Sequence, residues 1–368
     1  MLHENWSFYL ESHECLRMSE FPMYSDVTVR AEVLEGMGPL SFHNALPLKQ
    51  EGAGDVVIPV VVRVGFYSKP QHPDFSESSF THYHGGWLPD EIAALLSLSL
   101  GARFFAGDSI RDFDSYYNDP LGKPRFRSGV APPISHIPTQ RRILPEVCQS
   151  KDLRDVCFFN NFGKLSPAIA EKVIQCSRQY QNALWVAENN PELCWLMLIS
   201  AIEIAANEWA KSDQVKLSDL ETSYPEFYEE LVKNDNQNLL NLAAETFAPI
   251  TKATAKFMKF CKEFSPKQLE QKNSKGFKYT STQLSKALGT IYNHRSKALH
   301  SGIPFPAPMC SYPDEYEQGV YWQVPNQLGV YTKGATWVGS DIPMNLHLFH
   351  FLTREILLGW VKSLEPEG

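Results

Sequence analysis

The spacing of apolar side chains divides the chain into a β-rich part followed by a helical part. In residues 26–35 apolar and polar positions alternate, which predicts a half-buried strand. Residues 55–67 form a second strand-like run, in which Pro59 indicates a bend or an edge. A helix is predicted over residues 89–101, with acidic residues in its first turn. We therefore expect residues 1–150 to form a β-rich N-terminal domain.

A helical period begins after a linker that we place near residues 145–165. Ser166 before a proline is typical of a helix start, and Asn190 before a proline starts a second, strongly apolar helix, which predicts an αα-hairpin. Further helices are predicted at residues 224–234, 238–263, 282–300 and 345–364. The pattern predicts an α+β protein, with an all-α helical-bundle C-terminal domain over residues 160–368.

The helical part is interrupted at residues 303–343, a segment rich in proline, tyrosine, tryptophan and glycine. We interpret it as an ordered insertion, with a short hairpin formed by residues 319–325 and 328–332. Because it follows His300 directly, we expect it to lie near any site that this histidine serves.

Composition limits the setting in which the chain works. A chain of 368 residues is long enough for two domains, and its seven cysteines contain no Cys-x-x-Cys pair. That pattern favours reduced thiols in a cytoplasmic protein over a disulfide framework or a zinc site. We see neither an apolar run long enough to cross a membrane nor a signal peptide, so no membrane partner is expected.

The net charge of −8 is unevenly distributed. Residues 252–297 hold eleven lysines and arginines against two acidic residues, a local balance of +9, whereas residues 166–250 have a balance of −8. Because polyanion binding depends on local charge, the basic block favours a nucleic-acid partner. The alternative is a solvated lysine face that offsets the acidic helices nearby.

The basic block ends in the most informative stretch of the chain, which places an arginine and a histidine at the end of one predicted helix. Arg295 falls in the middle of an apolar stripe, where a guanidinium needs an anionic partner. His300 lies roughly 140° round the helix from Arg295. The stripe consists of Leu284, Leu288, Ile291 and Leu299.

The run from Tyr292 to Gly302, with Arg295-Ser296 followed by His300-Ser301-Gly302, resembles the HEPN superfamily of ribonuclease and RNA-binding domains. It is most similar to the branch found in ApeA-type anti-phage proteins, and the likeness covers roughly the C-terminal 200 residues. The resemblance implies a toxin or anti-phage effector that dimerises through its HEPN domain. It also implies an N-terminal domain that senses a phage-derived trigger.

The activity implied by the resemblance is metal-independent endoribonuclease cleavage, without a cofactor, that leaves a 2′,3′-cyclic phosphate. The substrate would be an RNA such as tRNA or mRNA. His300 would move a proton, and Arg295 would hold charge on the phosphoryl oxygens. Glu203, inside the apolar second helix, would pair with Arg295 or orient His300. The residues expected to bind substrate are Tyr292, Asn293, Ser296 and Lys297.

Three other interpretations stay open. Arg295 could be a structural arginine paired with a carboxylate, and His300 an ordinary helix-terminal histidine. The helical part could be a HEPN module that binds RNA or a nucleotide without catalysis. Alternatively, His82 and His84, on one side of a strand, could hold a metal in an N-terminal enzyme, with the helical part serving for dimerisation. For that metal site, His72 and Asp74 lie ten residues earlier.

Overall fold

The fold was analysed in a computed structural model of the chain. It describes residues 1–45, 56–68, 76, 78, 83–113, 120–125, 141–211, 217, 220–221, 225–233, 237–251, 253–266, 274–276, 279–325, 331–332 and 334–364.

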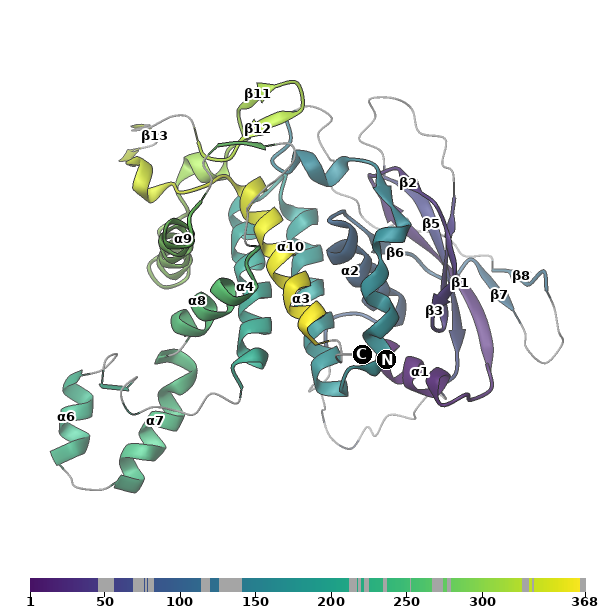
Figure 1. Cartoon of the computed structure of the whole chain (residues 1–368), viewed down its shortest axis with the longest axis horizontal. Coiled ribbons are helices and arrows are strands. Elements are labelled where there is room, and N and C mark those ends of the chain that lie inside the picture. Colours follow the sequence, from purple (N-terminus) through teal and green to yellow (C-terminus); the bar gives the residue numbers. More distant parts are fainter. Residues whose placement is uncertain are drawn as a thin grey trace.

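A seven-stranded sheet occupies the N-terminal part of the structure (Figure 1). Its strand order is β3-β4-β5-β1-β7-β8, and β6 pairs with β1, in antiparallel register throughout. The strands are β1 (Arg17–Ser25), β3 (Val33–Met37), β4 (Leu40–Asn44), β5 (Val57–Phe66), β6 (Phe105–Ala106), β7 (Arg111–Phe113) and β8 (Lys123–Pro124).

Alternation along the central strands gives the sheet one apolar face and one polar face. Phe21 on β1 and Val62 on β5 are paired in register and buried. The next pair in the register, Glu20 on β1 and Arg63 on β5, lies on the opposite face of the sheet. There Glu20 accepts a hydrogen bond of 2.7 Å from Arg63. This period-2 pattern is what an antiparallel sheet needs when only one face packs on a core.

The strand predicted over residues 55–67 is confirmed as β5, but it is not an edge strand. It lies between β4 and β1, and Pro59 sits where the register between β1 and β5 shifts. The missing N–H of proline is tolerated there because the ladder is already irregular. The single strand predicted over residues 26–35 is wrong. Ala31, with a φ of 62°, separates β2 (Val29–Arg30) from β3.

Two helices of the N-terminal part pack beside the sheet, α1 (Leu2–Leu10) and α2 (Leu88–Leu100). The prediction of α2 is confirmed, and Gly101 ends it in the left-handed region with a φ of 58°. Nearly all of the α2 side chains are buried, because the helix lies between the sheet and the helical layer, as Figure 1 shows.

The helical layer begins with an antiparallel pair of long helices. Ser166 accepts a hydrogen bond from the backbone N–H of Ile169, and Asn190 does the same for Leu193, so both predicted N-caps are present. The helices of this layer are α3 (Pro167–Val186), α4 (Pro191–Trp209), α6 (Pro225–Lys233), α7 (Gln237–Thr251), α8 (Ala253–Phe264), α9 (Ser281–Ser301) and α10 (Leu346–Ser363).

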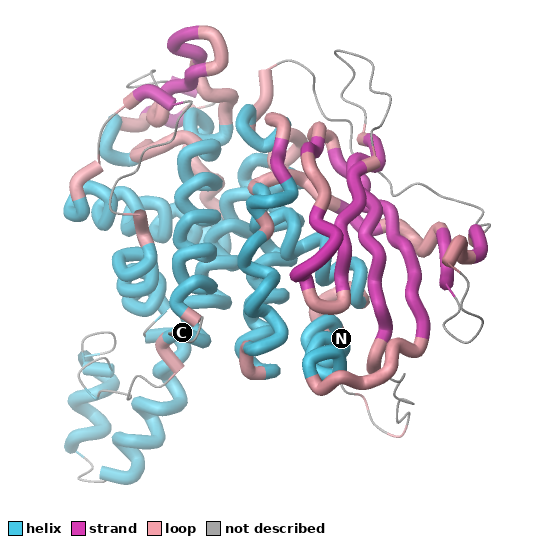
Figure 2. The backbone as a smooth tube through the Cα atoms, turned by 45° about the vertical axis from the view of Figure 1, so that its right-hand side comes forward, coloured by secondary structure: helices cyan, strands magenta, loops and turns pink. Residues whose placement is uncertain are grey.

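The predicted helix over residues 238–263 is two helices, α7 and α8. Helix α8 packs on α4, α9 and α10, whereas α6 and α7 form an outlying pair with a small apolar cluster of their own. In Figure 2 this outlying pair extends away from the rest of the molecule. The separation explains why one continuous helical pattern does not give one helix, since its two halves pack on different partners.

The described residues of the insertion form short strands, and residues 328–330 of the predicted hairpin lie outside the described residues. Residues 320–322 do form a strand, β12, but it pairs with β11 (Glu315–Glu317) and β10 (Ser274–Lys275). Strand β13 (Tyr331–Thr332) pairs with β14 (Ala335–Thr336). Another short strand, β9 (Lys151–Asp152), pairs in parallel with β2.

The α+β class is confirmed, with a sheet in the N-terminal part and a mostly helical C-terminal part (Figure 2). One hydrophobic cluster runs from Leu2 to Val361 and includes side chains from the sheet, α2 and the long helices. The division into domains at residues 1–150 and 160–368 stays a prediction. Within the described ranges, no helix has both the length and the apolar character that crossing a membrane demands.

Candidate functional site

Helix α9, which carries the motif, is defined by its own end signals. Thr280 and Gln283 form a capping box: the Thr280 hydroxyl accepts from the N–H of Gln283, and the Gln283 side chain accepts from the N–H of Thr280. At the other end Gly302 adopts a φ of 64° and stops the helix. The predicted boundaries, residues 282–300, are therefore confirmed to within one residue.

Arg295 lies where the hydrophobic pattern placed it, and its side chain is 21% exposed. Its Nη2 donates a hydrogen bond of 2.9 Å to Oε2 of Glu203, which projects from α4. The ion pair that we expected between these residues is present. The ion pair joins α4 to α9, two helices that pack together. The guanidinium is therefore held in place on a largely buried surface.

Tyr292 completes the cluster from the preceding turn of α9. Its hydroxyl donates a hydrogen bond of 2.8 Å to Oε1 of Glu203, and the Arg295 guanidinium lies 5.6 Å from the centre of its ring. Burial, and then the Glu203 carboxylate, raise the pKa of Tyr292 to about 12, so the phenol stays protonated and donates. Both oxygens of Glu203 are thus used to position Tyr292 and Arg295.

Changing Tyr292 to phenylalanine is expected to lower the free energy of unfolding by about 1 kcal/mol, because the half-buried Glu203 carboxylate loses a hydrogen-bond donor. Urea denaturation measures this change. The matched control is Tyr312→Phe, in which the replaced tyrosine is exposed and the stability should stay unchanged. Equal losses in both variants would contradict a structural role for the Tyr292 hydroxyl.

His300 is not brought to the Glu203–Arg295 pair. It is exposed near the end of α9, and among the described residues it has no hydrogen bond or ion pair. Asn293 and Lys297 are exposed on the same side of the helix, and Ser296 is half-buried. The expected apolar position Leu299 is 52% exposed, although its neighbour Ala298 packs against the core.

His294 lies on a different side of α9, as the helical period predicts. Its Nε2 is 2.7 Å from the backbone oxygen of Asp341, and its ring lies near Phe305. Burial lowers the pKa of His294, which favours the neutral ring. His294 therefore ties α9 to the insertion.

Three residues of the alternative metal site in the N-terminal part, His72, Asp74 and His82, lie outside the described residues. His84 is described, and its Nε2 lies 2.6 Å from Oε1 of the buried Glu91 at the start of α2. No group of three or more possible metal ligands gathers within the ranges that the structure describes.

A buried charge cluster that we did not predict joins the two parts of the chain. Arg103 is fully buried and donates to Asp26 at 2.8 Å, to Glu188 at 3.0 Å and to the backbone oxygen of Leu184 at 2.7 Å. Its partners are far away in sequence, so no local pattern could reveal it. The two carboxylates raise the pKa of Arg103, which keeps the guanidinium charged despite its burial.

Two histidines of α10 are buried close to this cluster. Nε2 of His350 lies 2.5 Å from the Tyr180 hydroxyl oxygen. The ring nitrogens of His347 have no hydrogen-bond partner among the described residues. Burial lowers the pKa of His347 to about 3 and that of His350 well below its usual value. Nearby, burial raises the pKa of Glu146 to about 7.

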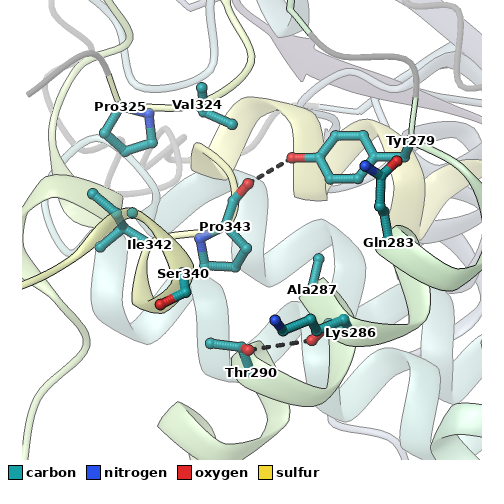
Figure 3. Close-up of a pocket in the computed structure, with 11 residues that line it drawn as sticks. Tyr279, Gln283, Lys286, Ala287, Thr290, Val324, Pro325, Ser340, Ile342 and Pro343 are labelled. Carbon is teal, nitrogen blue, oxygen red and sulfur yellow. Dashed lines mark hydrogen bonds between the residues drawn. The ribbon is translucent and has the colours of Figure 1, made fainter. Parts of the chain in front are cut away.

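A pocket with a volume of about 430 Å³ lies between α9 and the insertion (Figure 3). Helix α9 contributes Gln283, Lys286, Ala287 and Thr290, which are spaced to share one side of the helix. We did not predict the pocket, because the segments that face α9 come from residues 324–325 and 339–343, and no pairing signal links them to the helix.

Comparison of the chain with protein-family models, with curated proteins and with solved structures gives no match. The geometry of its own residues is therefore the basis for assigning a function.

Proposed function

We propose that the protein is a metal-independent endoribonuclease of HEPN type, acting as a toxin or anti-phage effector. The observation that carries the proposal is the fixed guanidinium of Arg295. Glu203 and Tyr292 hold it at the surface of the helical layer, and among the described residues only one of its N–H groups is used in a hydrogen bond. The others are available to phosphoryl oxygens, which an arginine can bind bidentately.

The reaction needs no nucleophile from the protein, because the 2′-hydroxyl of RNA attacks the adjacent phosphorus. It needs a group that moves a proton near neutral pH, and His300 has an accessible imidazole for this purpose. Arg295 would stabilise the charge that gathers on the phosphoryl oxygens. Asn293, Ser296 and Lys297, on the His300 side of α9, would bind the ribose and phosphates of the strand.

The separation of His300 from Arg295 within one chain supports a site that two chains complete. In such a homodimer the exposed end of α9 from one copy would lie across the Arg295 of the other, so that both groups reach one phosphate. The sheet of the N-terminal part would receive the phage-derived trigger.

The same separation favours a second candidate, a module that binds RNA without cutting it. In that case Arg295 and the exposed lysines of α9 would hold phosphates, and His300 would have no proton to transfer. Binding would weaken steeply with salt while no product formed.

Cleavage of total RNA and tRNA by the purified protein in EDTA tests the proposal. We expect fragments that end in a 2′,3′-cyclic phosphate, and we expect Arg295→Ala and His300→Ala each to lower the rate at least about tenfold. The matched controls are Arg154→Ala and His13→Ala, which change exposed residues outside the helical part.

Cleavage that survives in both site variants would refute these assignments. RNA binding without cleavage, in every variant and in cells exposed to phage, would favour the binding module.

A further inference from the structure

The pocket between α9 and the insertion has walls that are already fixed. The Tyr279 hydroxyl donates a hydrogen bond of 2.5 Å to the backbone oxygen of Pro343, which Figure 3 shows as a dashed line across the upper part of the pocket. On another side His294 contacts the backbone oxygen of Asp341 at 2.7 Å. A pocket of this volume with preformed walls is of the kind that takes a small molecule or one unit of a polymer.

The lining combines flat apolar surfaces with a few polar groups. Val324 and Pro325 lie across the pocket from Thr290, while Ile342 and Pro343 form a neighbouring wall (Figure 3). Such a surface suits a planar ring, which buries both faces and needs few hydrogen bonds.

Two polar side chains of the lining, those of Gln283 and Lys286, have donors that no described residue accepts from. Gln283 uses its side-chain oxygen on Thr280, and its amide nitrogen has no hydrogen bond to the described residues. Lys286 is exposed at the edge of the pocket and makes no ion pair with any described acidic residue. An amide donor beside a flat apolar wall, with an ammonium group at its rim, matches a heteroaromatic ring that carries a phosphate.

The position of Lys286 links the pocket to the motif. Lys286, Lys297 and His300 lie within about 60° of arc on one exposed side of α9, and Lys286 precedes Lys297 by about 16 Å along the helix axis. A strand that placed a base in the pocket could therefore run along this side of α9, with its phosphates beside both lysines, and reach His300.

We propose that this pocket binds the base of a nucleotide and that Lys286 pairs with its phosphate. The same chemistry has two sources, a base of an RNA strand or a free nucleotide. With an RNA strand the pocket would select the base at a fixed distance from the cut, and that part of the proposal rests on the proposed ribonuclease function.

Calorimetry tests the pocket with probes that the protein cannot cleave. The probes are the four nucleoside 5′-monophosphates, the four nucleosides, ribose 5-phosphate, and a heptanucleotide of RNA methylated at every 2′-oxygen. We expect at least one monophosphate to bind more tightly than its nucleoside and than ribose 5-phosphate.

Two variants change the pocket without touching the Glu203–Arg295 pair. Lys286→Gln should weaken the monophosphate about fivefold while leaving the nucleoside unchanged, since only the phosphate loses its partner. Ser340→Trp places an indole on a lining position and should weaken both by tenfold or more. Their controls, Lys362→Gln and Ser311→Trp, change exposed residues outside the lining and should bind like the unmodified protein.

The outcomes separate the possibilities. If Ser340→Trp weakens the heptanucleotide as strongly as the monophosphate, the pocket takes a base of an RNA strand; if it weakens only the monophosphate, the ligand is a free nucleotide. No binding by any probe at millimolar concentration, or binding that Ser340→Trp leaves intact, would overturn the proposal. Because no probe is cleaved, a failed cleavage assay leaves this test unaffected.

Discussion

Replacing Arg103 with alanine is expected to lower the free energy of unfolding by about 3–5 kcal/mol, among the largest effects that a single change can have here. The guanidinium is fully buried, and its two carboxylate partners, Asp26 and Glu188, are 1% and 2% exposed. Without Arg103 the protein would hold two buried carboxylates whose main cationic partner is gone. Their desolvation cost would then outweigh the remaining hydrogen bonds.

Guanidinium denaturation at pH 7.5 measures this loss, with Arg154→Ala as the matched control. Arg154 also pairs with an aspartate, Asp152, but its side chain is 75% exposed, and pairs of this kind contribute little to stability. We expect the control to leave the free energy of unfolding unchanged within the error of the measurement. A similarly small loss in Arg103→Ala would show that the buried cluster relaxes or admits water at little cost.

The second large effect is a loss of stability in acid, caused by His347 and His350. Their pKa values are lowered in the folded state, so below about pH 6.5 the unfolded chain takes up protons that the folded chain does not. The stability that they contribute is therefore present above pH 6.5 and is lost as the pH falls toward about 3 for His347. At pH 5 His347 accounts for about 2 kcal/mol, and His350 acts in the same direction.

Glu146 opposes this loss over the same range. Its pKa is raised from 4.5 to about 7, so its contribution is complete below pH 4.5 and is lost as the pH rises through 7. When the pH falls from 7 to 5, protonation of Glu146 would raise the free energy of unfolding by about 2–3 kcal/mol. Lys151, whose pKa burial lowers to about 8, changes charge above this window.

In Glu146→Gln the stabilisation that comes from protonating Glu146 is absent. The loss of stability in acid should therefore be larger in this variant than in the unmodified protein. We expect this variant to lose at least about 2 kcal/mol between pH 7.5 and pH 5, measured by urea denaturation at each pH. Adding His347→Gln should restore about 2 kcal/mol of that loss, while adding His13→Gln, on an exposed residue, should restore none. Equal pH profiles for these two double variants would contradict the role of His347.

The sequence was most informative where a structural signal is local. Ser166 and Asn190 mark helix starts, and Gly302 ends α9, because a cap is made by residues within one turn of each other. The pairing of Glu203 with Arg295 was also predictable, since each is a charged group on an apolar helix face and each needed a partner.

The features that escaped prediction depend on residues that are distant in sequence. Arg103 resembles any loop arginine until Asp26 and Glu188 are placed beside it. The pocket requires α9 to meet residues 324–325 and 339–343, which no periodicity indicates. Leu299 followed the apolar stripe yet is exposed, because a sequence pattern does not show which positions of a stripe meet a partner.

The burial of α10 in the core affects the order in which parts of the molecule can fold. Leu348, Leu352 and Trp360 of this helix are buried in the cluster that also contains side chains of the sheet and the long helices. During synthesis α9 leaves the ribosome before α10. The helix that carries Arg295 is therefore available while α10 is still missing from the layer of helices that supports it. Because α10 packs on α4 and α8, which in turn contact α9, the pair formed by Glu203 and Arg295 would become rigidly supported only after α10 had docked.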